Sequence, residues 1–132
     1  MVSATVMCLA LNLYYEGRSE IYMSRIAIAQ VTLNRVSSPK YPNTVCEVVK
    51  QKDQFSWYWD GLSDNPREKG AWSQAKDLAA LVLKYPDTVK IDCVGSALHY
   101  HATYVNPYWN SHLKKHCVVG SHIYYGDRKN DG

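Results

Sequence analysis

Apolar residues in the first two thirds of the chain recur at the three- and four-residue spacing of helices. Between Ser3 and Glu16 they cover nearly every side of a helix, which is typical of a helix buried in a core. Ser3 can cap its start, and Gly17 is a suitable stop because glycine accepts a left-handed backbone. The pattern predicts helices over residues 3–16, 19–36 and 68–84, with a short helix from residue 44.

Polar residues mark where two of these helices begin. Ser19 can cap the second helix, which places Glu20 in its first turn, where the helix dipole favours a negative charge. Thr44 and Glu47 have the spacing of a capping box, which predicts the start of the short helix.

The pattern changes near the C-terminus. Short apolar stretches at 117–119 and 122–125 flank Gly120-Ser121, which predicts a β-hairpin. No internal repeat or linker divides the 132 residues, so we expect one domain over 1–132. The predicted fold class is α+β, mainly α, with a small antiparallel hairpin or sheet near the C-terminus.

Charge and cysteine content limit the binding partners and the cysteine state that we expect for this domain. The net charge is +3 without a Lys/Arg run, and no apolar run is long enough for a membrane span, so neither nucleic acid nor membrane is expected as a partner. No Lys or Arg precedes Arg18, so a secretory signal is not expected. Cys8, Cys46, Cys93 and Cys117 form no C-x-x-C pair; two disulfides are possible, but without a signal we expect free thiols.

Aromatic residues suggest a binding surface. The chain has 11 Tyr and 4 Trp but 1 Phe, and Tyr and Trp join an apolar face to a polar group. Residues 54–61 and 98–109 mix such rings with amide, hydroxyl and imidazole groups, which suits the two kinds of surface on a sugar. Ordinary packing of half-buried rings is the alternative.

Glu16 is the candidate acid. It shares a helix face with Leu9, Asn12 and Leu13 and lies in the last turn of a buried helix. The helix dipole and partial burial both disfavour its charge, so we expect a raised pKa, as a general acid requires. A solvated carboxylate paired with Arg18 is the alternative.

The histidines only loosely suggest a metal site. His99 and His101 point the same way if their segment is extended, and His112 and His116 would share a helix face. Their spacing fits no strong zinc signature, so neither a metal nor another cofactor is expected.

Several stretches together resemble the SleB/CwlJ family of cell-wall hydrolases. They are LALNLYYEGRSE (9–20), IAIAQVTLNRV (26–36), YPNTVC (41–46), QFSW (54–57), HYHA (99–102), VNPYW (105–109) and GSHIYY (120–125). The resemblance covers nearly the whole chain and implies a compact lysozyme-like domain that cleaves peptidoglycan glycan strands, with Glu16 as the catalytic acid. The expected substrate-binding residues are Glu20, Gln54, Phe55, Ser56, Trp57, His99, Tyr100, His101, Tyr104 and Trp109.

The sequence also departs from the family's pattern. Trp59 stands where the family often has a Cys, which removes one possible partner of Cys46. Gly17 and Ser19 replace the Ala and Gly of the family's Glu-Ala-Arg-Gly-Glu motif but leave both Glu residues in place.

The resemblance implies a lytic transglycosylase that cuts between N-acetylmuramic acid and N-acetylglucosamine with one Glu and forms a 1,6-anhydro sugar. The alternatives are a hydrolytic muramidase or glucosaminidase, a zinc-dependent peptidoglycan amidase, and a glycan-binding module without activity. We expect a monomer that stays in the cytoplasm until it is released to the wall, as a bacteriophage endolysin does.

Overall fold

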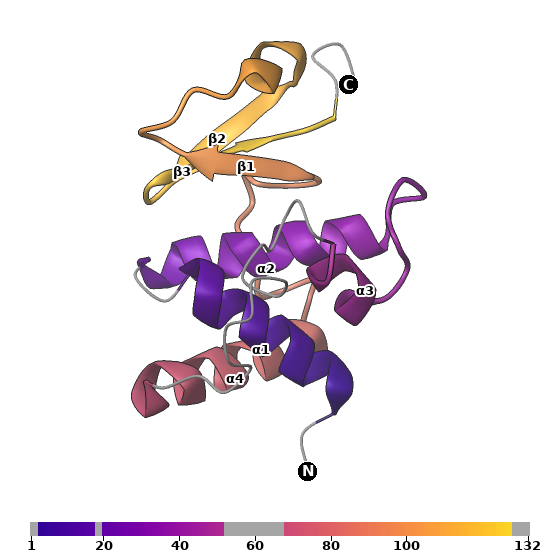
Figure 1. Cartoon of the computed structure of the whole chain (residues 1–132), viewed down its shortest axis with the longest axis vertical. Helices are drawn as coiled ribbons and strands as arrows, with labels where there is room; N and C mark the ends of the chain where they lie inside the picture. The colour runs from indigo at the N-terminus through magenta and orange to yellow at the C-terminus, as the bar shows by residue number, and fades with distance from the viewer. Residues whose placement is uncertain (1–2, 18–19, 52–67, 128–132) are drawn as a thin grey trace.

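The computed structural model describes residues 3–17, 20–51 and 68–127. Four helices form one part of the molecule, and a three-stranded antiparallel sheet of order β1-β3-β2 covers the far side of α2 (Figure 1). The elements are α1 Ala4–Gly17, α2 Tyr22–Val36, α3 Val45–Val49, α4 Lys69–Lys84, β1 His99–Ala102, the 3-10 helix η2 Tyr108–His112, β2 Lys115–Val119 and β3 His122–Tyr125. The prediction of a mainly helical α+β fold is confirmed.

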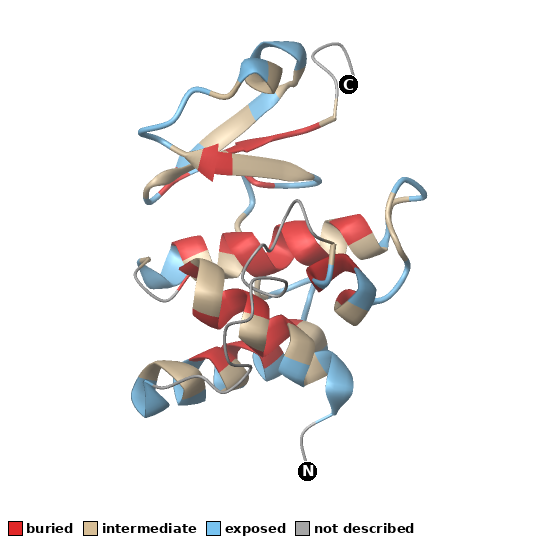
Figure 2. Ribbon diagram, in the orientation of Figure 1, coloured by how far each residue is buried: buried red, intermediate tan, exposed pale blue. Residues whose placement is uncertain are grey.

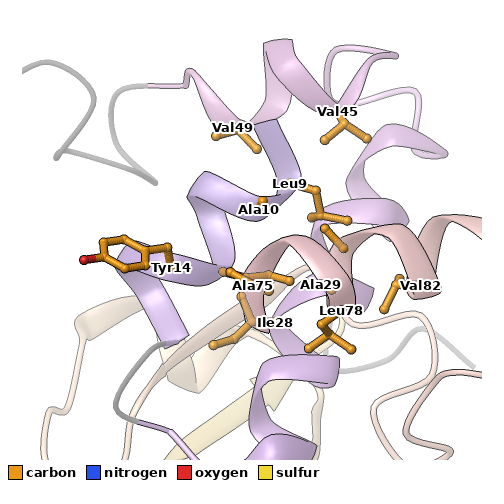
Figure 3. Packing of buried hydrophobic residues seen from close by; sticks show 12 residues of the cluster. Leu9, Ala10, Tyr14, Ile28, Ala29, Val45, Val49, Ala75, Leu78 and Val82 are labelled. Carbon is orange, nitrogen blue, oxygen red and sulfur yellow. The ribbon is translucent and has the colours of Figure 1, made fainter. Parts of the chain in front are cut away.

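The larger core lies around α1. Leu9 and Leu13 of α1 are fully buried and pack with Ile28 of α2 and with Leu78 and Val82 of α4. Figure 3 shows Leu9, Ile28 and Leu78 meeting between the helices, and Figure 2 shows the buried sides facing inward. The near-continuous apolar run of α1 is explained by this central position.

A second core joins α2 to the sheet. Ala27 and Val31 of α2 pack with Val119 and Tyr124 of the sheet. Because α2 is covered by helices on one side and by the sheet on the other, it is buried around most of its circumference. This helix therefore carries side chains into the space where the two parts of the molecule meet.

The predicted helix starts are confirmed for two helices and wrong for a third. The Ser3 hydroxyl accepts a hydrogen bond from the Val6 amide, and Thr44 accepts one from Glu47. However, α2 begins at Tyr22, with no side-chain cap at its start, so Glu20 precedes the helix instead of lying in its first turn. Ser19 lies outside the described residues.

Gly17 is the last residue of α1, and it does not have the left-handed backbone expected of a helix stop. A Cβ at this position would lie 3.3 Å from side-chain carbons of Arg25 and of Ile28. The Arg25 Nε also donates to the Gly17 carbonyl at 3.0 Å. Close approach of α1 to α2 therefore accounts for this glycine.

The hairpin around Gly120-Ser121 is confirmed. Gly120 has a φ of +59°, which favours glycine, and a Cβ there would lie 3.2 Å from the Cβ of Ser24. The turn thus packs closely against the start of α2. The third strand, β1, pairs with β3 and completes the sheet. The expectation that His112 and His116 share a helix face is wrong, because His116 lies in β2.

The expectation of free thiols is also wrong. Disulfides join Cys8 to Cys46 and Cys93 to Cys117, whose Cα atoms are 5.2 and 5.9 Å apart. The first links α1 to α3, and the second links the segment before β1 to β2. The folded chain brings each pair within the distance that a disulfide requires, whatever the sequence separation.

Candidate active site

An open groove of about 740 Å³ lies between the helices and the sheet, and we call it the Glu16 groove. Its helical wall is formed by the end of α1 and by the last turn of α2. The opposite wall comes from the sheet, from η2 and the residue after it, and from Asp127, two residues after β3 ends. The lining residues are Glu16, Arg35, His99, Tyr100, His101, Ala102, Tyr108, Trp109, Leu113, His122 and Asp127.

Glu16 contributes a carboxyl group that is still partly protonated at neutral pH. Burial raises its pKa to about 7, while the hydrogen bond from Tyr100 acts in the opposite direction. The Tyr100 hydroxyl donates to Glu16 Oε1 at 3.3 Å. Burial holds the pKa of Tyr100 well above its ordinary value, so this hydroxyl stays protonated and remains a donor. The expected rise in the Glu16 pKa is confirmed.

Arg35 places a buried cation in the wall of the same groove. Its side chain is 2% exposed, its Nε donates to the Leu98 carbonyl at 2.8 Å, and its guanidinium lies 5.1 Å from the centre of the Tyr41 ring. Burial lowers its pKa, but an arginine remains charged at neutral pH. Sequence reasoning missed this residue, because α2 also carries Arg25, Gln30 and Asn34, so one more polar side chain near its end gave no signal.

Glu20 lies outside the lining of the groove, behind the turn between β2 and β3. The Ser121 hydroxyl is 2.8 Å from both of its carboxylate oxygens, and the Ser24 hydroxyl donates to Oε1 at 3.1 Å. Burial acts to raise the pKa of Glu20, but the Ser121 hydrogen bond, the electrostatic attraction of His122 and the Ser24 hydrogen bond outweigh it and leave the pKa below its ordinary value. Direct contact with substrate, as expected for Glu20, is not supported by this position.

His99 and His101 lie on one side of β1, as expected of an extended segment, and both face Trp109. The ring centres of His99 and His101 lie 6.0 and 5.5 Å from that of Trp109. His99 Nε2 is 3.3 Å from Asp127 Oδ1, and burial lowers the pKa of His99 despite this partner. His101 Nδ1 donates to its neighbour's carbonyl at 2.8 Å, and Nε2 lies 2.8 Å from the Tyr125 hydroxyl.

These contacts leave little room for a histidine metal centre. The two His101 nitrogens already have protein partners, and His116 Nδ1 donates to the Val94 carbonyl at 2.7 Å. In residues 3–17, 20–51 and 68–127 no three His, Cys, Asp or Glu side chains are grouped as metal ligands would be.

The remaining aromatic candidates fall into two groups. Tyr104 is 85% exposed and is not part of the groove lining. Tyr108 belongs to the predicted aromatic stretch 98–109 but not to the expected substrate-binding residues; it is 89% exposed and does line the groove. Gln54, Phe55, Ser56 and Trp57 lie outside the described residues, so their role in substrate binding stays a prediction.

Comparison with solved structures supports the same fold. The chain is 28% identical to the catalytic domain of the germination-specific lytic transglycosylase SleB from Bacillus anthracis, with a TM-score of 0.70 over 93% of this chain and 95% of that one. The catalytic domain of the Bacillus cereus SleB protein is 29% identical, with a TM-score of 0.62 over 95% and 92% of the two chains. The lysozyme-like fold expected from the resemblance is therefore confirmed.

Sequence relatives are found among spore cortex-lytic enzymes. The enzyme from Bacillus cereus is 39% identical over 69 residues, and that from Bacillus subtilis is 43% identical over 53 residues. These matches cover 50% and 40% of this chain but 27% and 17% of the relatives. The chain thus matches about a quarter or less of the length of these proteins.

The family assignment rests on a longer match. The cell wall hydrolase family matches residues 19–125, which include the groove-lining residues except Glu16, three residues before the match, and Asp127, two residues after it. In the described part of the chain, no helix is long and apolar enough to cross a membrane. The sequence match and the shared fold lead to one conclusion: the chain belongs to the cell wall hydrolase family.

Proposed function

We propose that the chain is a peptidoglycan lytic transglycosylase that cleaves the bond between N-acetylmuramic acid and N-acetylglucosamine, with Glu16 as its catalytic residue. The observation that carries the proposal is the pKa of Glu16, about 7, in a groove whose walls also carry aromatic rings. A carboxylic acid that is still protonated near neutral pH can donate a proton to a glycosidic oxygen. The likeness to the SleB catalytic domains supports the same reaction.

The reaction proceeds in two proton transfers. Glu16 first gives its proton to the glycosidic oxygen as the bond to C1 of the muramic residue breaks. The C6 hydroxyl of the same sugar then attacks C1, and the Glu16 carboxylate takes the hydroxyl proton. The products are a 1,6-anhydro sugar and a new chain end with a free hydroxyl. Because the attacking group belongs to the substrate, no activated water is required.

The second carboxylate in the described lining of the groove favours this mechanism over hydrolysis. Glycosidases that use water normally have two carboxyl groups flanking the bond. Among the described lining residues the second carboxylate is Asp127, which pairs with Lys40 and His99. Its hydrogen bond from Lys40 holds the pKa of Asp127 below its ordinary value. A carboxylate engaged by two basic side chains is a poor base for activating water.

Mass spectrometry of digested peptidoglycan tests the proposal. We expect 1,6-anhydro-muramic ends from the wild-type chain and none above background from Glu16→Gln. Glu47→Gln is the matched control, because Glu47 is exposed and belongs to the α3 capping box. Reducing sugar ends would assign a hydrolytic muramidase or glucosaminidase, released peptides an amidase, and binding without products a glycan-binding module. Each of these would overturn the proposal.

A further inference from the structure

His122 is a groove residue that the proposed mechanism does not use. It begins β3, lines the Glu16 groove, and its side chain is 13% exposed. Its ring packs edge-on against Tyr100, with the ring centres 5.2 Å apart and the planes at 81°. Tyr100 in turn donates to Glu16, so His122 and Glu16 both contact the same tyrosine.

The buried edge of the His122 ring faces Glu20. Nδ1 is buried and lies 3.3 Å from Glu20 Oε1, a close electrostatic contact without hydrogen-bond geometry, and it has no hydrogen-bond partner among the described residues. A lone pair on Nδ1 would face the lone pairs of the carboxylate and be repelled. Nδ1 is therefore the nitrogen that carries the proton, which leaves Nε2 with its lone pair when the ring is neutral.

Glu20 is held firmly in the position that sets this tautomer. Ser121 and Ser24 donate to its carboxylate, and Gly120 lets the turn approach closely enough for Ser121 to reach it. Burying a carboxylate is unfavourable, and an apolar contact would pack the turn against α2 equally well. That the charge of Glu20 is kept here indicates a functional role for the His122 ring beside it, at the opposite edge, which carries Nε2.

We propose that His122 binds substrate in the Glu16 groove by accepting, at Nε2, a hydrogen bond from a sugar hydroxyl, and that Glu20 is the positioning residue that fixes its tautomer. The inference rests on the proposed function, since it takes a glycan as the occupant of the groove. Glu20 thus acts on the substrate through His122 and not by contact of its own.

Two substitutions of His122 separate this role from packing. The amide of Asn reaches the place of Nδ1 and keeps a polar group beside Glu20, whereas the longer Gln places its amide near Nε2. We expect His122→Asn to keep the wild-type Tm but to lose about tenfold or more of the lytic rate, the order of effect of one lost hydrogen bond to substrate. His122→Gln should retain more activity than His122→Asn, and the exposed His112→Asn should behave as wild type. Wild-type activity in His122→Asn would overturn the inference.

The tautomer gives a test that does not depend on activity. A long-range ¹H–¹⁵N spectrum of the wild-type chain, recorded where the His122 ring is neutral, should show the proton on Nδ1. In Glu20→Gln, whose amide can donate as well as accept, the Nε2–H form should appear. A wild-type ring with its proton on Nε2 contradicts the inference. Glu16→Gln in the same lysis assay separates the two proposals: if only that variant is inactive, the proposed function stands and the role of His122 falls.

Discussion

The end of α1 and the segment just before α2 each carry a glutamate, and the two are four positions apart in the sequence. Glu16 is largely buried, and among the described residues its carboxyl group accepts one hydrogen bond, from Tyr100 at 3.3 Å; its pKa rises to about 7. Glu20 is also largely buried, yet Ser121 and Ser24 donate to it, His122 lies beside it, and its pKa falls below the ordinary value. At neutral pH Glu20 is therefore charged, whereas a large share of Glu16 is still protonated.

This contrast shows that burial alone does not set the charge of a carboxyl group in this protein. Burial acts to raise the pKa at both sites, and the number and closeness of the donors decide the outcome. The site with few donors keeps a proton that it can give to a substrate. The site with several donors keeps a charge that can orient a histidine.

Lysis assays should show the largest difference between the two sites. We expect Glu16→Gln to lower the rate of peptidoglycan lysis about 10²–10⁴-fold, because it removes the acid itself. Glu20→Gln should cost roughly tenfold, since it loosens the hold on His122 and leaves the acid in place. Turbidity loss of purified walls measures both. The reverse order, with both variants folded, would assign the acid to Glu20.

Removing a disulfide should test how each region is held in place. Cys8–Cys46 fastens the helix that carries Glu16 in its last turn, and Cys93–Cys117 fastens the strand that leads to Ser121. From loops of 38 and 24 residues, we expect their replacement by Ala pairs to lower the free energy of unfolding by about 4 and about 3 kcal/mol, respectively.

Urea denaturation of the two double variants measures these losses. Carboxyl ¹³C titrations of the two double variants should also differ. Because loss of Cys93–Cys117 frees the turn, the pKa of Glu20 should then move up toward its ordinary value, while the pKa of Glu16 stays near 7. An unchanged Glu20 pKa would mean that the turn is held by packing alone.

The stability of the two glutamine variants should change with pH in opposite directions. The pKa of Glu16 is about 7 in the folded chain against an ordinary value of 4.5, so its contribution is fully present below about 4.5 and is lost as the pH rises through 7. Glu16→Gln should therefore match wild type near pH 4 and be more stable by roughly 3 kcal/mol near pH 8.

For Glu20 the folded pKa is lowered, so its contribution is present above the ordinary value and is lost as the pH falls through the folded pKa. Glu20→Gln should be less stable than wild type at neutral pH, and the gap should narrow in acid. Thermal unfolding of the three proteins between pH 3 and 8 measures both trends. Parallel curves would mean that the two environments do not differ as described.

Local signals in the sequence predicted much of the fold and the character of Glu16. The caps at Ser3 and Thr44 act within one turn, and the positive φ of the hairpin glycine is a local backbone requirement, so a local pattern was enough to predict them. The burial of Glu16 followed from the apolar run around it, because α1 is surrounded on nearly all sides.

Features that depend on tertiary contacts could not be predicted in this way. Strand β1 forms because it pairs with β3, some twenty residues later, and the cysteine pairs are decided by which elements approach each other. Arg35 and His122 sit within ordinary elements and become groove residues only where α2 meets the sheet. Ser19 is a good cap by type, yet α2 begins at Tyr22, and Glu20 before it bonds to Ser121, a contact that a local pattern does not reveal.

The smallest predicted effect concerns the one hydrogen bond that works against the high pKa of Glu16. Tyr100→Phe keeps the ring that packs against His122 and removes the hydroxyl that donates to Glu16. Because this donor stabilises the charged carboxylate, its loss should raise the Glu16 pKa above 7, by up to about one unit for a bond worth roughly 1 kcal/mol. A carboxyl ¹³C titration measures the shift directly, and the alkaline limb of the pH profile of lysis should move to higher pH with it.

The pKa of Glu20 serves as the internal control and should not change, since Tyr100 does not bond to it. A Glu16 pKa that falls in Tyr100→Phe would mean that the variant admits water to the carboxyl group, and that exclusion of water by the tyrosine, rather than the balance of donors, keeps Glu16 protonated.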